Sequence, residues 1–273
     1  NPYQLVFASE DKAYVLRYGS DKIWIINPDA DSEAGFKLGE LDISAYDTDA
    51  PNANSGVIVD GKLFVLMERL DGYAVIQQGY VAVFDTNTDT EIDTAQGTAD
   101  GLMGIPVGVQ NPESLHYESD NGLLYLTGRG NIYKADAEAA GGDRFTGGLV
   151  TIDPDNYVAT MLLDDGTEES NQGFFRSATV IGADTGYVMS YTGGFSGTST
   201  LRRFHATTGV LADGAIADLE DMQLTTMSEA PSNQLWVAVS TDNPYVERID
   251  TASDSSVGQF NTELVPLNFA FVE

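Results

Sequence analysis

The sequence contains no cysteine and few positively charged residues. Without cysteine the chain has no disulfide, no thiolate metal ligand and no covalently attached haem. Lysine and arginine number 13 against 42 acidic residues, which gives a formal net charge of −29 at pH 7. A surface this negative repels nucleic-acid phosphates and anionic lipid headgroups. We therefore expect no nucleic-acid partner.

Long hydrophobic runs are also missing. No apolar segment approaches the roughly 18 residues that cross a bilayer as a helix, which predicts no membrane insertion. The chain opens with NPYQ, without a methionine or a signal-peptide pattern. We interpret it as a mature or trimmed product.

The apolar residues that are present have the spacing of β-strands. They alternate or run in fours and fives between clusters of Gly, Asp, Asn, Thr and Pro. The stretch Leu5–Asn27 shows the pattern, with three short strands predicted at Leu5–Ala8, Ala13–Leu16 and Ile23–Ile26. Polar turns separate these strands, and helical periodicity is almost absent.

Variants of this stretch recur down the chain. The aromatic residue of its second strand returns as Tyr14, Phe64, Tyr125, Tyr187 and Trp236, at intervals of 50, 61, 62 and 49 residues. A fourth short strand follows in each unit. One four-stranded sheet cannot bury its own apolar faces, but neighbouring sheets can cover one another. The repeat therefore predicts an all-β fold, a β-propeller of four-stranded antiparallel blades.

Several pieces of these units resemble a known repeat. They are SEDKAYVLRYGSDKIWIIN, VDGKLFVLM with VAVFDT, ESDNGLLYLTG with GLVTID, and SNQLWVAVS with ERIDT. They resemble the YncE-like, surface-layer-type repeat of the WD40/quinoprotein-like propeller group. The resemblance implies a periplasmic, secreted or cell-surface protein. It says little about function, because the group includes binding, scaffold and enzyme members.

We predict a single propeller domain over residues 1–273. Its five blades are expected at about 1–50, 51–110, 111–170, 171–222 and 223–263, with an extra strand at 264–273. The last segment, LVPLNFAFVE, is similar to the opening NPYQLVFASE. Either it completes a ring by pairing elsewhere, or the chain is the C-terminal portion of a six- or seven-bladed propeller. The second interpretation is favoured.

Catalytic motifs are absent from the sequence. It contains no G-x-S-x-G, H-E-x-x-H or P-loop pattern, so no catalytic residue is predicted. Acid-rich turns could supply oxygen ligands to Ca²⁺, with Asp29, Asp31, Asp85 and Asp89 as candidates. None follows the spacing of a known calcium loop, and solvated turns are the alternative. We expect no other cofactor.

The scarce arginines suggest where a ligand could bind. Arg17, Arg69 and Arg129 follow the second strand of consecutive units, and Arg176 enters a first strand from the same side. In a propeller this side surrounds the mouth of the central channel. The candidate ligand-binding residues are Arg17, Tyr18, Glu68, Arg69, Glu113, Arg129, Tyr133, Arg176 and Tyr191. The alternative is that each arginine only neutralises a neighbouring acid.

From these features we expect a non-catalytic, extracytoplasmic scaffold that binds through this face. Its partner would be a small anionic ligand or another protein, because arginine and aromatic rings offer charge pairing and stacking. Two alternatives remain open. One is a metal-dependent propeller enzyme of lactonase or lyase type, and the other is a structural subunit of a cell-surface assembly.

Overall fold

The computed structural model describes residues 2–47, 49–72, 74–75, 77–97, 101–132, 143–191, 197–216 and 219–271. Regular structure in these residues is almost entirely β-strand. A single helical turn, α1 (Glu33–Phe36), precedes the fourth strand. No helix in the described part of the chain is long and apolar enough to cross a membrane.

The strands form five antiparallel sheets in chain order, which we call blades 1 to 5. Blade 1 contains β1 (Pro2–Phe7), β2 (Ala13–Arg17), β3 (Lys22–Ile26) and β4 (Lys37–Asp42). Blade 2 contains β5 (Ala53–Val59), β6 (Lys62–Met67), β7 (Gln78–Asp85), β8 (Thr90–Glu91) and β9 (Ile105–Gln110). Blade 3 contains β10 (Pro112–Glu118), β11 (Leu123–Gly128), β12 (Gly148–Ile152) and β13 (Ala159–Leu163).

The last two blades follow the same order. Blade 4 contains β14 (Phe174–Ile181), β15 (Thr185–Tyr191) and β16 (Ser199–His205). Blade 5 contains β17 (Leu224–Ala230), β18 (Gln234–Val239), β19 (Tyr245–Asp250) and β20 (Ser255–Asn261). The predicted succession of strand, turn and strand is therefore present in every blade.

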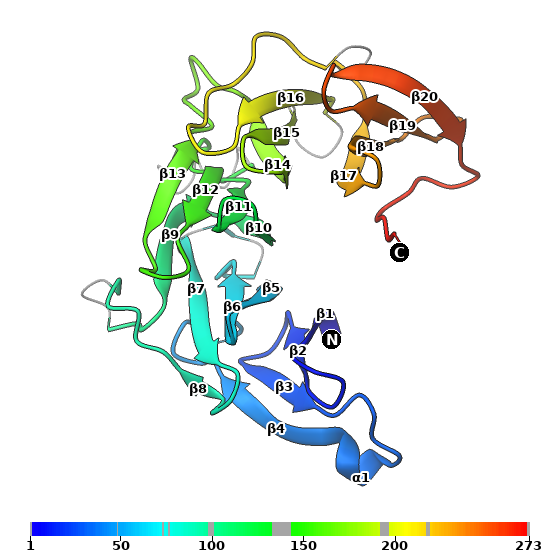
Figure 1. Ribbon diagram of the computed structural model, residues 1–273. Helices are drawn as coiled ribbons and strands as arrows, with labels where there is room; N and C mark the ends of the chain where they lie inside the picture. The colour runs from blue at the N-terminus through cyan, green and yellow to red at the C-terminus, as the bar shows by residue number, and fades with distance from the viewer. Residues whose placement is uncertain are drawn as a thin grey trace.

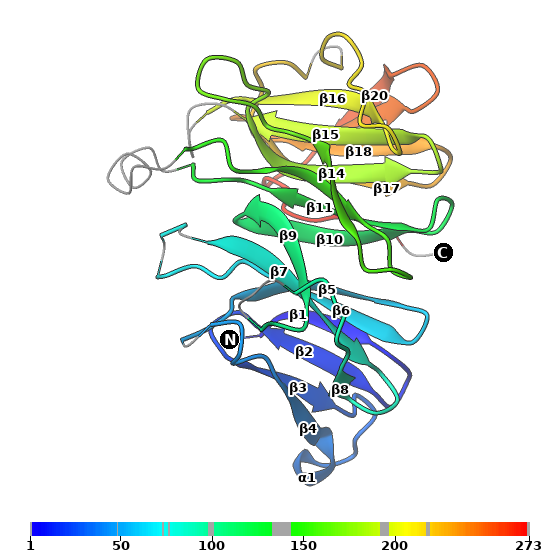
Figure 2. The ribbon, with the colours of Figure 1, turned by 90° about the vertical axis from the view of Figure 1, so that its left-hand side faces the viewer.

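The blades follow one another along an open arc (Figure 1). The first strands β1, β5, β10, β14 and β17 lie on the concave side of the arc, and the later strands lie outside them. Seen from the side, the strands of successive blades lie one above another (Figure 2). The described part of the chain thus forms five blades of a β-propeller, as the repeat predicts.

Three outer segments differ from the sequence predictions. The fourth strand expected in blade 4 at Gly209–Ile216 is reduced to one bridge, between Phe204 and Leu211. In blade 2 the outer position is divided between β8 and β9, which pair with different parts of β7. The extra strand expected at Leu264–Glu273 does not form over the described residues 264–271.

Aromatic contacts explain where that last segment lies. The rings of Phe269 and Phe271 pack against Trp236, with centroid separations of 6.1 and 5.1 Å. The segment therefore covers the face of blade 5 that points away from blade 4. Burial of the aromatic rings against this face is more favourable than their exposure to solvent.

The apolar core lies between the blades. Tyr14 and Leu16 of blade 1 are fully buried in one cluster with Leu63 and Val65 of blade 2. Further clusters join blades 2 and 3, blades 3 and 4, and blades 4 and 5. Each blade is thus held by the neighbour that covers its face, as expected for a repeat architecture.

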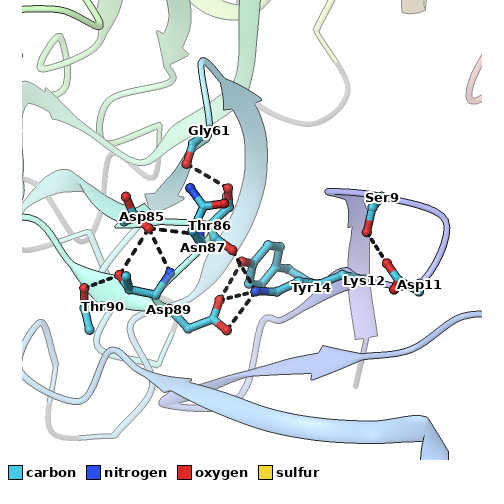
Figure 3. Close-up of polar contacts among 11 residues, drawn as sticks. Ser9, Asp11, Lys12, Tyr14, Gly61, Asp85, Thr86, Asn87, Asp89 and Thr90 are labelled. Carbon is cyan, nitrogen blue, oxygen red and sulfur yellow. Dashed lines mark hydrogen bonds and ion pairs between the residues drawn. The ribbon is translucent and has the colours of Figure 1, made fainter.

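The second-strand aromatics also make polar contacts with the next blade. The Tyr14 hydroxyl donates to Asp89 at 2.7 Å, and the Lys12 ammonium donates to the same carboxylate at 2.8 Å (Figure 3). The Tyr187 hydroxyl donates to Asp254 of blade 5 at 2.6 Å. Tyr125 donates in the same way, to the carbonyl of Ala206. The aromatic position is therefore fixed by packing between blades.

Candidate ligand-binding site

Each first strand has an irregular register near its beginning. The pairing of β1 with β2 skips Tyr3, and the corresponding pairings skip Asn54, Arg176 and Thr225. Each of these residues stands three positions before the first-strand residue that pairs with the second-strand aromatic. In blade 3 the residue at that position is Glu113. A bulge redirects a side chain out of the regular alternation. We call this set the first-strand ring, and it consists of Tyr3, Asn54, Glu113, Arg176 and Thr225.

A second set of equivalent positions lies at the same end of the blades. Each member stands four residues after the second-strand aromatic, where the second strand ends. We call it the second-strand ring, and it consists of Tyr18, Glu68, Arg129, Tyr191 and Ser240. The blade fold fixes where these residues lie, but packing between blades does not dictate their identity. Their variation from blade to blade therefore sets the chemistry of this end.

The two rings meet in a basic pocket at blades 3 to 5. This cavity of about 220 Å³ is lined by Arg129, Arg176, Tyr191, Gly197, Ser199, Gln223, Leu224, Thr225 and Ser240. Among the residues that the structure describes, its lining holds two arginines and several hydroxyl groups but no carboxylate. Two guanidinium groups with adjacent hydroxyls can bind a carboxylate or a phosphate through several charge-assisted hydrogen bonds.

The two arginines are held differently. Arg129 Nη2 lies 2.5 Å from Glu113 Oε2, while its Nε is buried without a partner in the described structure. Arg176 Nη1 donates to the Leu224 carbonyl at 3.4 Å. Within the described residues Arg176 forms no ion pair with a carboxylate. Its positive charge is therefore available to the pocket.

A second, acidic pocket of about 190 Å³ lies beside the first and shares Arg129 with it. Its lining is Tyr3, Tyr18, Glu68, Leu70, Val75, Asn111, Glu113, Arg129 and Ile132. The Tyr18 hydroxyl donates to Glu68 Oε2 at 2.7 Å, and Asn54 Nδ2 donates to Glu68 Oε1 at 2.6 Å. Tyr3 and Tyr18 stack at 5.3 Å. Residues of both the first-strand ring and the second-strand ring thus line this pocket as well.

Burial controls the ionisation of the acidic pocket. Desolvation raises the pKa of Glu68, and the nearby Glu113 raises it further, while the hydrogen bonds from Tyr18 and Asn54 oppose the shift. Desolvation also raises the pKa of Glu113, although the Arg129 guanidinium opposes it. Both carboxylates therefore hold protons more tightly than exposed glutamates do.

Six of the nine predicted ligand-binding residues lie in these pockets: Tyr18, Glu68, Glu113, Arg129, Arg176 and Tyr191. Tyr133 lies outside the described residues. Arg17 lies elsewhere, with its guanidinium 4.5 Å from the Trp24 ring. It lines an apolar hollow on the face of blade 1 that points away from blade 2.

Arg69 also differs from the prediction. Its backbone φ is +58°, and its guanidinium lies over the Tyr80 ring at 4.8 Å. Arg69 Nε donates to the Tyr46 carbonyl at 2.7 Å. The left-handed backbone at the end of β6 therefore turns this side chain into blade 2, where it ties neighbouring segments together.

The four candidate calcium ligands lie in two separate turns, as the sequence places them. Asp89 binds Lys12 and Tyr14, and Asp85 accepts backbone hydrogen bonds from Asn87 and Thr88. Asp29 and Asp31 are on the β3–β4 connection of blade 1. In the described part of the chain, no group of three or more His, Asp or Glu side chains could hold a metal ion.

Sequence reasoning missed four residues of the two rings, namely Tyr3, Asn54, Thr225 and Ser240. The sequence repeat does mark these four positions. Each stands at a constant distance from the repeated second-strand aromatic or from the residue that pairs with it. Hydroxyl and amide side chains attract less notice than arginine in an acidic chain. Counting positions along the repeat would have found them.

Together, fold and site define a β-propeller that presents two adjoining polar pockets of opposite charge at one end of its blades. No family model matches the chain, and no curated protein matches its sequence. Among solved structures it is similar to a chain of Kuenenia stuttgartiensis hydrazine synthase. That match has a TM-score of 0.63 at 12% identity and covers 98% of this chain and 67% of the other. At this identity the likeness shows the fold alone.

Proposed function

We propose that this propeller is a non-catalytic binding scaffold that holds a small anionic ligand in the basic pocket. The observation that carries the proposal is the composition of that pocket. Its described lining gathers two arginines and no carboxylate in a protein with 42 acidic and only 13 basic residues. Random placement of so few cations among so many acids would not favour such a lining.

Arg176 separates this proposal from simple charge neutralisation. Arg129 has Glu113 as its partner, so its charge is compensated within the protein. Arg176 donates to a carbonyl and forms no direct ion pair in the described structure, although its charge also attracts the Glu113 carboxylate from a distance. A bound carboxylate could form a direct ion pair with Arg176, and Ser240 and Gln223 offer further hydrogen-bonding groups. The cavity of about 220 Å³ suits a small molecule.

Isothermal titration calorimetry tests the proposal. Pentanoate, glutarate and inorganic phosphate are titrated into the wild-type protein, Arg176→Gln and Arg248→Gln. Arg248 is a matched control, because it is a half-buried arginine of blade 5 that does not line the pocket. At least one of the anions is expected to bind, with affinity reduced about tenfold or more in Arg176→Gln alone. Equal binding by all three proteins, or no binding of any anion, overturns the proposal.

We also propose that the protein works outside the cytoplasm, as a periplasmic, secreted or cell-surface member of the YncE-like propeller group. The repeat resemblance and the strongly acidic composition support this location. Fractionation of the source cells tests it, since recovery of the protein only with cytoplasmic markers would contradict it.

A further inference from the structure

We infer that the ligand is a zwitterion: its carboxylate occupies the basic pocket, and an alkylammonium group occupies the acidic pocket. This inference rests on the proposed function, because it assumes that the basic pocket holds an anion. It extends that function by assigning a use to Glu68 and the residues around it.

The order of charges along the arc is the first argument. In the two rings the acids belong to blades 2 and 3, as Glu68 and Glu113, while the arginines belong to blades 3 and 4, as Arg129 and Arg176. The flanking blades contribute only neutral groups to the rings. The mouth therefore has a negative half and a positive half. A ligand with a positive group at one end and a negative group at the other is complementary to these two halves.

Glu68 supplies the second argument. Its side chain is buried, with only 4% of the residue exposed, and its two oxygens accept hydrogen bonds from neutral groups. No cation forms a direct ion pair with it in the described structure, because Arg129, which attracts it electrostatically, is bonded to Glu113. A buried carboxylate without a countercharge is costly. A ligand cation beside it would remove that cost.

The walls of the acidic pocket favour an alkylammonium group over a metal ion. Leu70, Val75 and Ile132 offer apolar contact for methylene groups. The stacked rings of Tyr3 and Tyr18 can face an organic cation. The described residues contain no group of three or more His, Asp or Glu side chains that could hold a metal ion.

Arg129 joins the two pockets. It lines both of them, and its guanidinium is bonded to Glu113 of the acidic pocket. A single short ligand can therefore contact both halves. An ω-amino acid has the required chemistry, because its two charges lie at opposite ends of an alkyl chain.

Matched pairs of ligands test the inference by calorimetry. The pairs are 4-aminobutanoate with butanoate, 5-aminopentanoate with pentanoate, and 6-aminohexanoate with hexanoate. In the wild-type protein, at least one amino acid should bind about tenfold more tightly than its partner, because its ammonium gains a charge-assisted bond. If no amino acid exceeds its matched carboxylate by more than about twofold, the inference is wrong.

Glu68→Gln should abolish this preference for the amino acid over its matched carboxylate. Glu91→Gln is the control, because Glu91 is a half-buried glutamate whose pKa burial also raises, but it contacts Tyr46 and is not among the described residues that line either pocket. Glu113→Gln provides a second test should Glu68→Gln fail to fold, and it should lower the preference as well. A preference that survives in both Glu68→Gln and Glu113→Gln overturns the inference.

The same data separate the two proposals. If plain carboxylates bind in an Arg176-dependent manner but amino acids gain nothing, the zwitterion inference alone fails. If no carboxylate depends on Arg176, the proposed function itself fails.

Discussion

At the scale of single residues, Asp165 is a buried carboxylate that lies outside both pockets. Its Oδ2 accepts the Gly147 N–H at 3.1 Å, and its Oδ1 has no partner in the described structure. Burial raises the pKa of Asp165 from 3.8 to about 7, and the neighbouring acid Asp164 contributes to the shift. The folded protein therefore binds this proton more tightly than the unfolded chain does.

This difference predicts a pH dependence of stability. Because the folded pKa is raised, the contribution of Asp165 is most favourable below about pH 4 and is lost as the pH rises to about 7. Asp165→Asn should remove the penalty and stabilise the protein at pH 8 by roughly 1–3 kcal/mol, with little effect at pH 4. Urea unfolding at both pH values measures this. Asp155→Asn, at an exposed site, is the control, and equal effects of both variants would contradict the account.

Residue identity alone could not show which arginines reach the mouth. The sequence placed Arg17, Arg69 and Arg129 after equivalent strands, yet only Arg129 lines a pocket at the mouth. Arg17 stacks on Trp24 because strand alternation points it to the outer face of blade 1. Arg69 turns away because of its left-handed backbone. The direction in which each arginine side chain points depends on a one-residue shift in strand register or on one backbone dihedral angle. The residue types alone do not reveal either of these.

At the scale of structural elements, contacts between blades depend on the second-strand aromatic. The Tyr187 hydroxyl donates to Asp254 at 2.6 Å across the interface of blades 4 and 5. Blade 2 has Phe64 at this position, and its ring instead packs against Tyr157 of blade 3 at 6.4 Å. An aromatic side chain is thus the constant part of the contact between blades, and the tyrosine hydroxyl adds a hydrogen bond.

Tyr187→Phe should therefore destabilise the protein moderately. The loss of one hydrogen bond predicts a decrease of about 1 kcal/mol in the free energy of unfolding, measured by urea denaturation. The ring stays buried, and Asp254 keeps its ion pair with Arg203, so a larger loss is not expected. Tyr117→Phe serves as the control, because the Tyr117 hydroxyl makes no hydrogen bond in the described structure. Identical stability of the two variants would contradict the assigned contact.

Burial also decides which elements the sequence could predict. Strand β12 is buried along its whole length, and such a mostly apolar run marks a strand clearly in the sequence. Strand β20 is exposed at six of its seven residues, as expected for an outer strand with one paired edge. Outer segments therefore carry a weak hydrophobic signal. The reduced fourth strand of blade 4 and the missing strand at 264–271 both belong to this poorly marked class.

At the scale of the whole molecule, the open arc gives the blades unequal support. Blades 2, 3 and 4 each pack between two neighbours, whereas blades 1 and 5 each contact one. In a repeat architecture stability is approximately a sum over such interfaces. Leu5 and Phe7 of β1 are accordingly exposed on the free face of blade 1, at 43% and 59%.

Amide hydrogen exchange should reflect this arrangement. The equivalent second strands β2 and β18, in the terminal blades, should exchange faster than β6, β11 and β15, because a terminal blade opens with the loss of one interface only. Mass spectrometry of peptides that cover these strands measures the difference. Equal protection in all five strands would contradict the idea that each blade is stabilised by its neighbours.

The central claim is that the basic pocket at the mouth binds an anion, and crystallography with an anomalous scatterer locates an anion directly. Crystals soaked in 4-bromobutanoate should show a bromine peak in the cavity shared by Arg129 and Arg176, with the carboxylate bonded to Arg176. Crystals of Arg176→Gln soaked in the same way should lack it. A wild-type pocket without a bromine peak, or an unchanged peak in Arg176→Gln, would contradict the account.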